Sequence, residues 1–385
     1  MKNQNQQLTP TSDQQTNAQA EVLKLGIDIH KSKYVVVHQM DNQPPKSPQK
    51  FSPEAFLTWI AGQRGRAKRI VTCYEAGCFG YVLHRQLESM GIENFVVRPR
   101  NWDEYGSKVK TDARDARELC SHLDRYLAGN ERALSVVRVP TEEEERSRSL
   151  SRQRDTLAKE LKRLQNVGIS NARYYGYELK TSWWKSINFK KLLEELPEYL
   201  IAILQPFQAV LAAIDKQFRE ATAREERTAN RQLPVGLGAL TASVLDNEFR
   251  DYTRFRNRGE VASYTGLCPG EASSGGTRKQ GSINKHGNPR IRHTLIEAVW
   301  RFMQFQPDYE PIKNWKQRMC NEPFGAARKK KMIVAVARRF AVDWWRINTG
   351  QIQPEEVGLK VAYPTAYATR ALRAGRTSKV YAKTT

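Results

Sequence analysis

The chain has 385 residues, with 63 Lys or Arg against 41 Asp or Glu, so its formal net charge is +22 at pH 7. This length allows two or three domains at about 100–200 residues each, and the positive excess makes nucleic acid the leading partner class. The five cysteines lack zinc-site spacing and are typical of reduced thiols in the cytoplasm. No apolar run approaches the roughly 20 residues of a membrane span, so no membrane association is expected.

The first part of the chain has the pattern of an α/β layer fold. Residues 1–21 are rich in Gln, Asn and Thr, which predicts a disordered tail. Short apolar runs then predict strands at 22–29, 34–40, 69–74 and 95–98. Helices are predicted at 53–61, 80–90 and 111–127. Strands alternating with helices indicate one α/β domain over residues 22–140.

The middle of the chain is predicted to be a helical or coiled-coil linker over residues 141–228. A capping-box pattern at Thr141 and Glu144 begins it, and leucines recur at helical or heptad spacing. Breaks are expected near Pro197 and Pro206. Such helices most often act as a spacer or a dimerisation arm, and a nucleic-acid clamp is the alternative.

A third domain is expected over residues 229–350, followed by a basic tail at 351–385. A glycine-bearing turn leads into a helix within 233–245, and further helices are predicted at 289–305 and 326–348. Residues 249–264 are expected to be a polar connector and 266–288 a glycine-rich loop.

Four carboxylates stand out in the α/β region. Asp28 lies inside an apolar strand, where a charge is costly unless it is compensated, and Glu75 ends another strand. Asp112 and Asp115 are three residues apart and share one helix face. These carboxylates also have purely structural explanations. A carboxylate at a strand end could accept backbone hydrogen bonds, and the helical pair could stabilise the start of its helix. Together they suit a cluster of oxygen ligands for Mg²⁺, with Mn²⁺ as the alternative ion. His30 shares the side of Asp28 and is interpreted as a hydrogen-bonding neighbour.

The loop GLCPGEASSGGTRKQGSINKHGNPRIRH combines glycines, hydroxyl groups and positive charge. By composition it is a flexible loop that binds a phosphate backbone, and one of its serines could be a nucleophile if it were activated. The residues predicted to contact nucleic acid, here and at the basic start of the helix near 326, are Arg278, Lys279, Lys285, Arg290, Arg292, Arg328, Lys329 and Lys330.

The strings GIDIHK, YEAG and KTDARDA together resemble the DEDD transposases of bacterial insertion sequences, over about residues 23–350. The resemblance implies a RuvC-like N-terminal domain of RNase H type and a mostly helical C-terminal transposase domain. The family's four acidic residues match Asp28, Glu75, Asp112 and Asp115, which implies catalytic, metal-binding roles for them.

The resemblance also implies serine chemistry. The family's nucleophilic serine precedes a glycine, which matches Ser274, and the adjacent Ser273 is the alternative. Its attack on a scissile phosphate would give a covalent serine–DNA intermediate. A structured RNA from the element would guide the choice of donor and target DNA, and dimers would pair into a tetramer. We expect such a protein to act in the bacterial cytoplasm, on the nucleoid.

The sequence is compatible with three other functions. A junction-resolving nuclease would use the same carboxylates with water as the nucleophile. An actin-like ATPase would need a glycine and a hydroxyl group after the first Asp, where this chain has Ile29, His30 and Lys31. A non-catalytic RNA-binding scaffold would function without metal.

Overall fold

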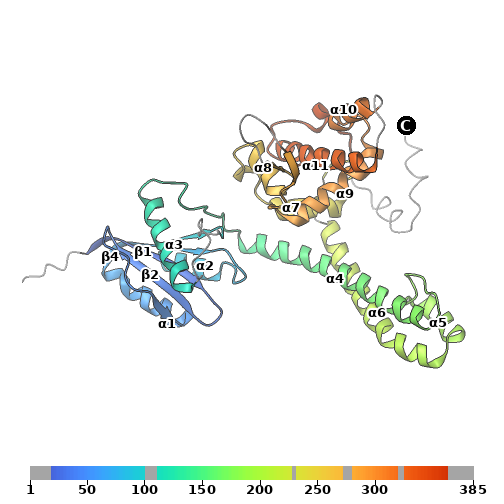
Figure 1. Ribbon diagram of the computed structural model, residues 1–385, viewed down its shortest axis with the longest axis horizontal. Helices are drawn as coiled ribbons and strands as arrows, with labels where there is room; N and C mark the ends of the chain where they lie inside the picture. Colours follow the sequence, from blue (N-terminus) through green and yellow to red (C-terminus); the bar gives the residue numbers. More distant parts are fainter. Residues whose placement is uncertain (1–18, 100–110, 228–230, 272–279, 320–324, 363–385) are drawn as a thin grey trace, which may run out of the picture. The chain divides into compact units, whose positions relative to one another are not determined.

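The computed structural model describes residues 19–99, 111–227, 231–271, 280–319 and 325–362. The chain divides into two compact units, residues 1–140 and 141–385. The first unit is a mixed α/β layer structure, and the second is built mainly from helices (Figure 1).

The first unit contains a five-stranded sheet with the strand order β3-β2-β1-β4-β5. Its strands are β1 (Ala20–Ile29), β2 (Tyr34–Met40), β3 (Gln49–Phe51), β4 (Ala67–Glu75) and β5 (Glu93–Val97). Strands β1, β2 and β3 pair antiparallel, whereas β4 and β5 run parallel to β1. The strands predicted at 22–29 and 34–40 form an antiparallel hairpin, but β3 was missed because three residues are too short for a periodic signal.

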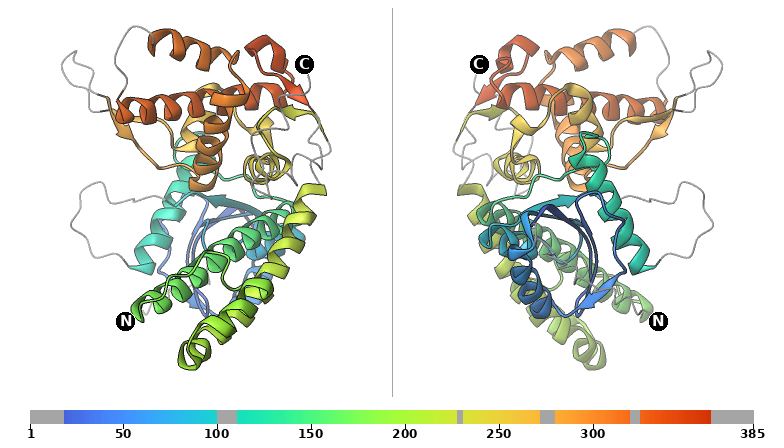
Figure 2. Two further views of the ribbon diagram at one scale, coloured as in Figure 1. Left: turned by 90° about the vertical axis from the view of Figure 1, so that its right-hand side faces the viewer. Right: turned by 90° about the vertical axis from the view of Figure 1, so that its left-hand side faces the viewer.

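Helices cover both faces of this sheet. Helices α1 (Pro53–Ala61) and α2 (Val82–Ser89) pack on one face, and α3 (Asp112–Leu127) packs on the other, as Figure 2 shows for α1 and α3. Ser52 caps α1, its Oγ accepting a hydrogen bond from the Ala55 N–H at 3.2 Å. The buried residues of β1 and β4 therefore divide between two cores, one on each face.

Gly26 sets the distance between β1 and α3. A Cβ atom at this position would lie 2.2 Å from the carbonyl oxygen of Ala116 and 2.3 Å from the amide nitrogen of Cys120. Both atoms belong to the backbone of α3, so no side-chain rotation relieves the overlap. The absence of a side chain on Gly26 thus lets the helix pack directly against the strand backbone.

The second unit begins with an arm made of α4 (Glu142–Tyr174), α5 (Ser186–Glu195) and α6 (Glu198–Arg227). The capping box at Thr141 and Glu144 is present as predicted. Helices α4 and α6 lie side by side (Figure 1) and share a core with Trp183. The break expected near Pro197 is confirmed, since α5 ends at Glu195 and α6 begins at Glu198. The break expected near Pro206 is wrong, because α6 continues through this residue while it packs along α4.

Contrary to the expectation from the sequence, helix α6 has the length and composition of a membrane span. Its segment Glu198–Glu226 has a mean hydropathy of 1.2 over its most apolar window, and 17% of that window is buried. A single helix of this kind is weak evidence for a membrane. The arm instead leaves apolar side chains exposed on both α5 and α6, including Ile187, Tyr199 and Val210.

The remainder of the second unit surrounds one large core that contains Phe302 and Phe340. Its helices are α7 (Ala239–Phe249), α8 (Arg258–Thr265), α9 (Pro289–Phe305), α10 (Glu310–Met319) and α11 (Ala326–Asn348). Two short antiparallel pairs complete it, formed by β6 (Leu233–Pro234) with β9 (Val361–Ala362), and by β7 (Pro269–Glu271) with β8 (Gln280–Ile283).

Two expectations for this region are wrong. The polar connector expected at 249–264 contains α8, whose Asn257 cap and short buried face are weak sequence signals. The ordered fold also extends past residue 350, because Ile352, Val357 and Leu359 are buried in the core.

A buried cluster of ion pairs joins the arm to this core. Glu248 on α7 is 1% exposed and accepts two hydrogen bonds from Arg152 on α4, from Nε and from Nη2, each at 3.0 Å. Arg290 on α9 donates to Glu248 at 3.1 Å, to Asp155 at 2.6 Å and to Ser151 at 2.8 Å. Burial opposes the ionisation of Glu248, but the hydrogen bonds from Arg152 and Asn288 outweigh it and lower its pKa to about 2.

Gly26→Ala should destabilise the first unit. The added methyl group would force α3 away from β1, at a cost of at least about 2 kcal/mol, as for other overpacked cores. Chemical denaturation of the full chain measures this change. Gly62→Ala is the matched control, because a Cβ there meets open space and its φ of −68° suits any residue. Equal stability of the two variants would contradict the packing role of Gly26.

Glu248→Gln should destabilise the second unit by about 3 kcal/mol, because it removes the buried charge that pairs with Arg152 and Arg290 and leaves Arg290 with Asp155 alone. The control Glu194→Gln, on an exposed position of α5, should change the free energy of unfolding by less than about 0.5 kcal/mol. Urea denaturation monitored by tryptophan fluorescence measures both variants.

The effect of Glu248→Gln should depend on pH. The pKa of Glu248 in the folded state, about 2, lies below its ordinary value of 4.5. Its contribution to stability is therefore complete above pH 4.5 and lost as the pH falls towards 2. That contribution amounts to about 3 kcal/mol. The stability difference between the parent and the variant should narrow over this window, and a constant difference would contradict the assigned pKa.

Candidate metal centre

The strand register places Asp28 and Glu75 side by side at the carboxyl ends of parallel strands. Ile27 of β1 pairs with Tyr74 of β4, and both side chains belong to the core beneath α1 and α2. Because side chains alternate along a strand, the next residue of each strand, Asp28 and Glu75, projects towards the face that α3 covers. The register thus places these two carboxylates on the same face of the sheet.

The first turn of α3 brings the other two carboxylates to the same edge. Thr111 caps the helix, so that Asp112 and Asp115 both lie in its first turn. The Lys33 ammonium group, from the turn between β1 and β2, donates to Asp112 Oδ2 at 2.8 Å. Since Gly26 holds α3 against β1, this first turn lies beside the end of the strand that carries Asp28.

Three side chains form a tight cluster at this point. Atoms from Asp28, His30 and Asp112 all lie within 4.8 Å of one another. His30 Nε2 is 3.1 Å from Asp28 Oδ2 and 3.3 Å from Asp112 Oδ2. Sequence reasoning treated His30 as a neighbour and left it out of the site, although its spacing of two residues from Asp28 already placed both on one side of the strand.

The electrostatics of the cluster reflect crowded negative charge. Burial raises the pKa of Asp28 most strongly, His30 opposes this shift, and the charges of Asp112 and Asp115 raise the pKa further. Asp115 is therefore within electrostatic reach of Asp28, although it lies outside the tight cluster. The pKa of Asp112 is lowered, first by its hydrogen bond from Lys33. Oxygen ligands and one imidazole in this arrangement are suited to a divalent cation.

The predicted serine loop lies largely outside the described residues. Ser274, its alternative Ser273, and the basic residues Arg278 and Lys279 all fall in the range 272–279. Strands β7 and β8 pair on either side of that range, with Glu271 opposite Gln280. The nucleophile therefore stays a prediction from the sequence.

The other residues predicted to bind nucleic acid separate into two groups. Arg290 is 14% exposed, and its guanidinium group donates to Asp155, Glu248 and Ser151. Arg292 donates to the carbonyl oxygens of Thr265 and Lys285, each at 3.3 Å. This geometry favours a structural role for both arginines.

The second group faces solvent. Lys285, Arg328, Lys329 and Lys330 are exposed, and the last three form the basic start of α11. The Lys329 ammonium group lies 5.3 Å from the ring centre of Trp300, which is itself 40% exposed. Exposed cations beside an exposed aromatic ring suit a phosphate backbone with a neighbouring base.

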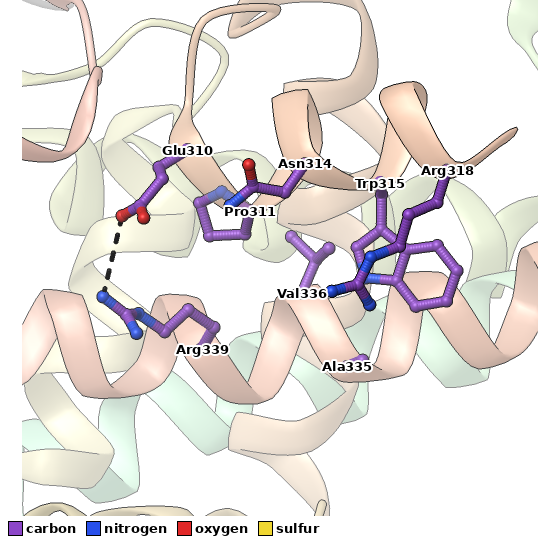
Figure 3. Close-up of a pocket in the computed structure, with 8 residues that line it drawn as sticks. All are labelled: Glu310, Pro311, Asn314, Trp315, Arg318, Ala335, Val336 and Arg339. Carbon is purple, nitrogen blue, oxygen red and sulfur yellow. Dashed lines mark ion pairs between the residues drawn. The ribbon is translucent and has the colours of Figure 1, made fainter. Parts of the chain in front are cut away.

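A pocket of about 200 Å³ lies between α10 and α11. Figure 3 shows Glu310 and Arg339 facing each other across one end, joined by an ion pair of 3.9 Å, with Arg318 beside Trp315 at the other end. The pocket contains none of the four predicted carboxylates, which belong to the first unit. It is therefore a feature separate from the metal centre.

Comparison with known proteins agrees with the motifs. A family model for transposases of the DEDD type found in IS110 elements matches residues 25–171, and the model of the transposase IS116/IS110/IS902 family matches residues 232–312.

Individual relatives extend this similarity over most of the chain. The y4rJ protein of Sinorhizobium fredii, which carries a transposase name, is 30% identical over 316 residues, covering 75% of this chain and 79% of the relative. The transposase for insertion sequence element IS1533 of Leptospira borgpetersenii is 25% identical, covering 72% and 84%. The transposase for insertion sequence element IS1328 of Yersinia enterocolitica is 23% identical, covering 85% and 97%.

Proposed function

This chain belongs to the DEDD transposase family of IS110-type insertion sequences, and from that premise we propose how it cuts and rejoins DNA. The catalytic centre consists of Asp28, Glu75, Asp112 and Asp115, which hold Mg²⁺ or Mn²⁺, and Ser274 is the nucleophile. The observation that carries this proposal is the meeting of Asp28 and Asp112 around His30 Nε2, at 3.1 and 3.3 Å.

The donor set fits a divalent cation. Carboxylate oxygens are the ligands that Mg²⁺ and Mn²⁺ prefer, and four carboxylates in one place repel each other unless a cation offsets their charge. The raised pKa of Asp28, which follows first from burial and also from Asp112 and Asp115, agrees with such crowding. When bound, the cation supplies stabilisation of the charge that develops on the phosphate oxygens.

The fold of the first unit supports a RuvC-like assignment. Its sheet has three antiparallel strands followed by two parallel ones, in the order β3-β2-β1-β4-β5, with helices on both faces. We therefore propose an RNase H-type architecture for residues 22–140. In this arrangement the central strand β1 carries Asp28 and the neighbouring strand β4 carries Glu75.

Ser274 would form a bond from its Oγ to the scissile phosphorus as the bond from phosphorus to the leaving DNA oxygen breaks. The serine proton is lost and the departing oxygen gains one, so the protein becomes joined to DNA through a phosphodiester. Attack by the hydroxyl of another strand reverses the step and releases the serine. The number of phosphodiester bonds is conserved, so strand exchange needs no external energy source.

The positive surface supports nucleic-acid partners. The net charge of +22 suits a protein that holds several strands at once, and the exposed Lys285, Arg328, Lys329 and Lys330 are candidates for backbone contacts. We propose that these strands are the element ends, the target DNA and a structured guide RNA encoded by the element. Base pairing would then choose the sequence, while the protein holds the backbones. This work would take place in the bacterial cytoplasm, on the nucleoid.

A junction-resolving nuclease is the second candidate. The four carboxylates all lie in the first unit, whereas Ser274 belongs to the second, so the metal centre by itself would serve a water nucleophile equally well.

The two candidates make different predictions for serine variants. The protein should be incubated with Mg²⁺, DNA carrying the element ends and the RNA transcribed from them, and covalent adducts mapped by mass spectrometry. We expect an adduct on Ser274, its loss together with strand exchange in Ser274→Ala, and retention of both in the adjacent control Ser273→Ala. The reverse pattern would make Ser273 the nucleophile. Cleavage that continues in both variants would favour the resolving nuclease, and Asp28→Asn should abolish cleavage in every case.

We further propose that the arm of residues 141–227 joins two copies of the chain, and that dimers pair into a tetramer. The support is the exposed apolar surface on α5 and α6, where Ile187 is 76% and Val210 is 50% exposed. Isolated apolar residues are common on protein surfaces, whereas several along one arm indicate an interface.

Val210→Glu should therefore weaken self-association, because it places a charge in the apolar contact. Light scattering coupled to size-exclusion chromatography should show a shift from dimer or tetramer towards monomer at equal protein concentration. Gln205→Glu is the matched control, since it adds the same charge at an exposed position on the same helix. Identical masses for both variants and the parent would contradict a role of the arm in self-association.

A further inference from the structure

His30 lies at the centre of the carboxylate cluster, although the family's acidic motif does not include it. Its Nε2 atom is 3.1 Å from Asp28 Oδ2 and 3.3 Å from Asp112 Oδ2. The backbone holds the ring at this place, because the His30 N–H donates to the Lys33 carbonyl oxygen at 3.0 Å and closes the turn after β1. The imidazole is thus fixed to the end of the same strand that carries Asp28.

The spacing of these atoms matches that of neighbouring ligands on one cation. Octahedral ligands at 2.0–2.2 Å from an ion lie about 3 Å apart when adjacent and about 4.2 Å apart when opposite. The two measured distances fit adjacent ligands, and all three donor atoms lie within 4.8 Å of one another. The contact between Nε2 and Asp28 Oδ2 also has hydrogen-bond geometry, but Nε2 carries at most one hydrogen, and a single N–H does not account for the second carboxylate oxygen, from Asp112, at 3.3 Å.

We propose that His30 is a ligand of the divalent cation, so that this chain binds its metal through one imidazole nitrogen as well as carboxylate oxygens. The inference rests on the metal centre of the proposed function and adds a residue to it. Mg²⁺ favours oxygen ligands, whereas imidazole favours transition metals. The site should therefore prefer Mn²⁺ over Mg²⁺ more strongly than a site made of carboxylates alone.

Lys33 provides a matched comparison within the same cluster. Its ammonium group contacts Asp112 Oδ2 at 2.8 Å, the same oxygen that His30 approaches. A protonated amine has no free electron pair and cannot ligate a cation, whereas the imidazole nitrogen can. Removing Lys33 therefore perturbs Asp112 from the same side without removing a metal ligand.

Titration of the full-length protein with Mn²⁺ and with Mg²⁺, followed by calorimetry, tests the metal preference. We expect His30→Ala to weaken Mn²⁺ binding by at least about 10-fold, the scale seen when a metal site loses a supporting residue, and to weaken Mg²⁺ binding less. The dissociation constant for Mg²⁺ divided by that for Mn²⁺ should therefore fall. In Lys33→Ala this ratio should stay at the parental value, and Asp28→Asn should abolish binding of both ions.

Pulsed electron paramagnetic resonance of the Mn²⁺-loaded protein tests ligation directly. A bound imidazole nitrogen modulates the electron spin echo, and we expect this modulation in the parent and in Lys33→Ala but not in His30→Ala. Labelling the parent with ¹⁵N-histidine should change the modulation frequency, which keeps the test valid even if His30→Ala fails to fold.

The outcomes separate the inference from the function on which it rests. Mn²⁺ that binds without nitrogen modulation, or with modulation that persists in a folded His30→Ala variant, overturns the role of His30 and leaves the carboxylate centre intact. Failure of the parent to bind either ion, or binding that Asp28→Asn does not change, overturns the metal centre itself.

Discussion

The close packing of α3 against β1 is the constraint on which the proposed chemistry depends. A backbone without a side chain at Gly26 lets the helix approach until the carbonyl oxygen of Ala116 occupies the place of a Cβ atom. This contact fixes where the first turn of α3 lies, and with it Asp112 and Asp115. Carboxylates that are far apart along the chain meet because one glycine lets a helix lie directly on the central strand.

The buried Glu248 and the half-buried Asp28 show two ways in which this protein compensates a negative charge. Glu248 is enclosed by Arg152, Arg290 and Asn288, and its pKa falls to about 2 because the protein itself supplies every compensating donor. The pKa of Asp28 is instead raised, first by burial and then by neighbouring carboxylates. The ion pairs of Glu248 hold the arm to the C-terminal core. The charge of Asp28 is compensated only in part, so its surroundings suit an added cation.

The basic residues divide in the same way between internal and external roles. Arg290 and Arg292 are used to hold neighbouring helices and loops, and their charge is directed into the protein. The start of α11 presents Arg328, Lys329 and Lys330 to solvent beside Trp300. A net charge of +22 is thus no measure of the surface available to nucleic acid, because part of it stabilises the fold.

The sequence by itself determined the α/β character of the first unit, the long helices of the second and the four acidic residues of the motif. These features depend on local signals: the apolar runs of β1 and β2, the Ser52 and Thr141 caps, and the strings around Asp28 and Asp112. Local signals fail for short elements such as β3. They also fail for α8, whose sequence shows only a weak helical pattern of apolar residues.

Only the tertiary structure decided which side chains meet. The sequence carries no distance between His30 and Asp112, because that distance depends on how closely α3 packs on the sheet. Nor does it distinguish the buried Arg290 from the exposed Lys329, since both lie in basic stretches and differ in what surrounds them. Spacing along a chain sets which residues share a face, whereas the packing of one element on another sets which faces come together.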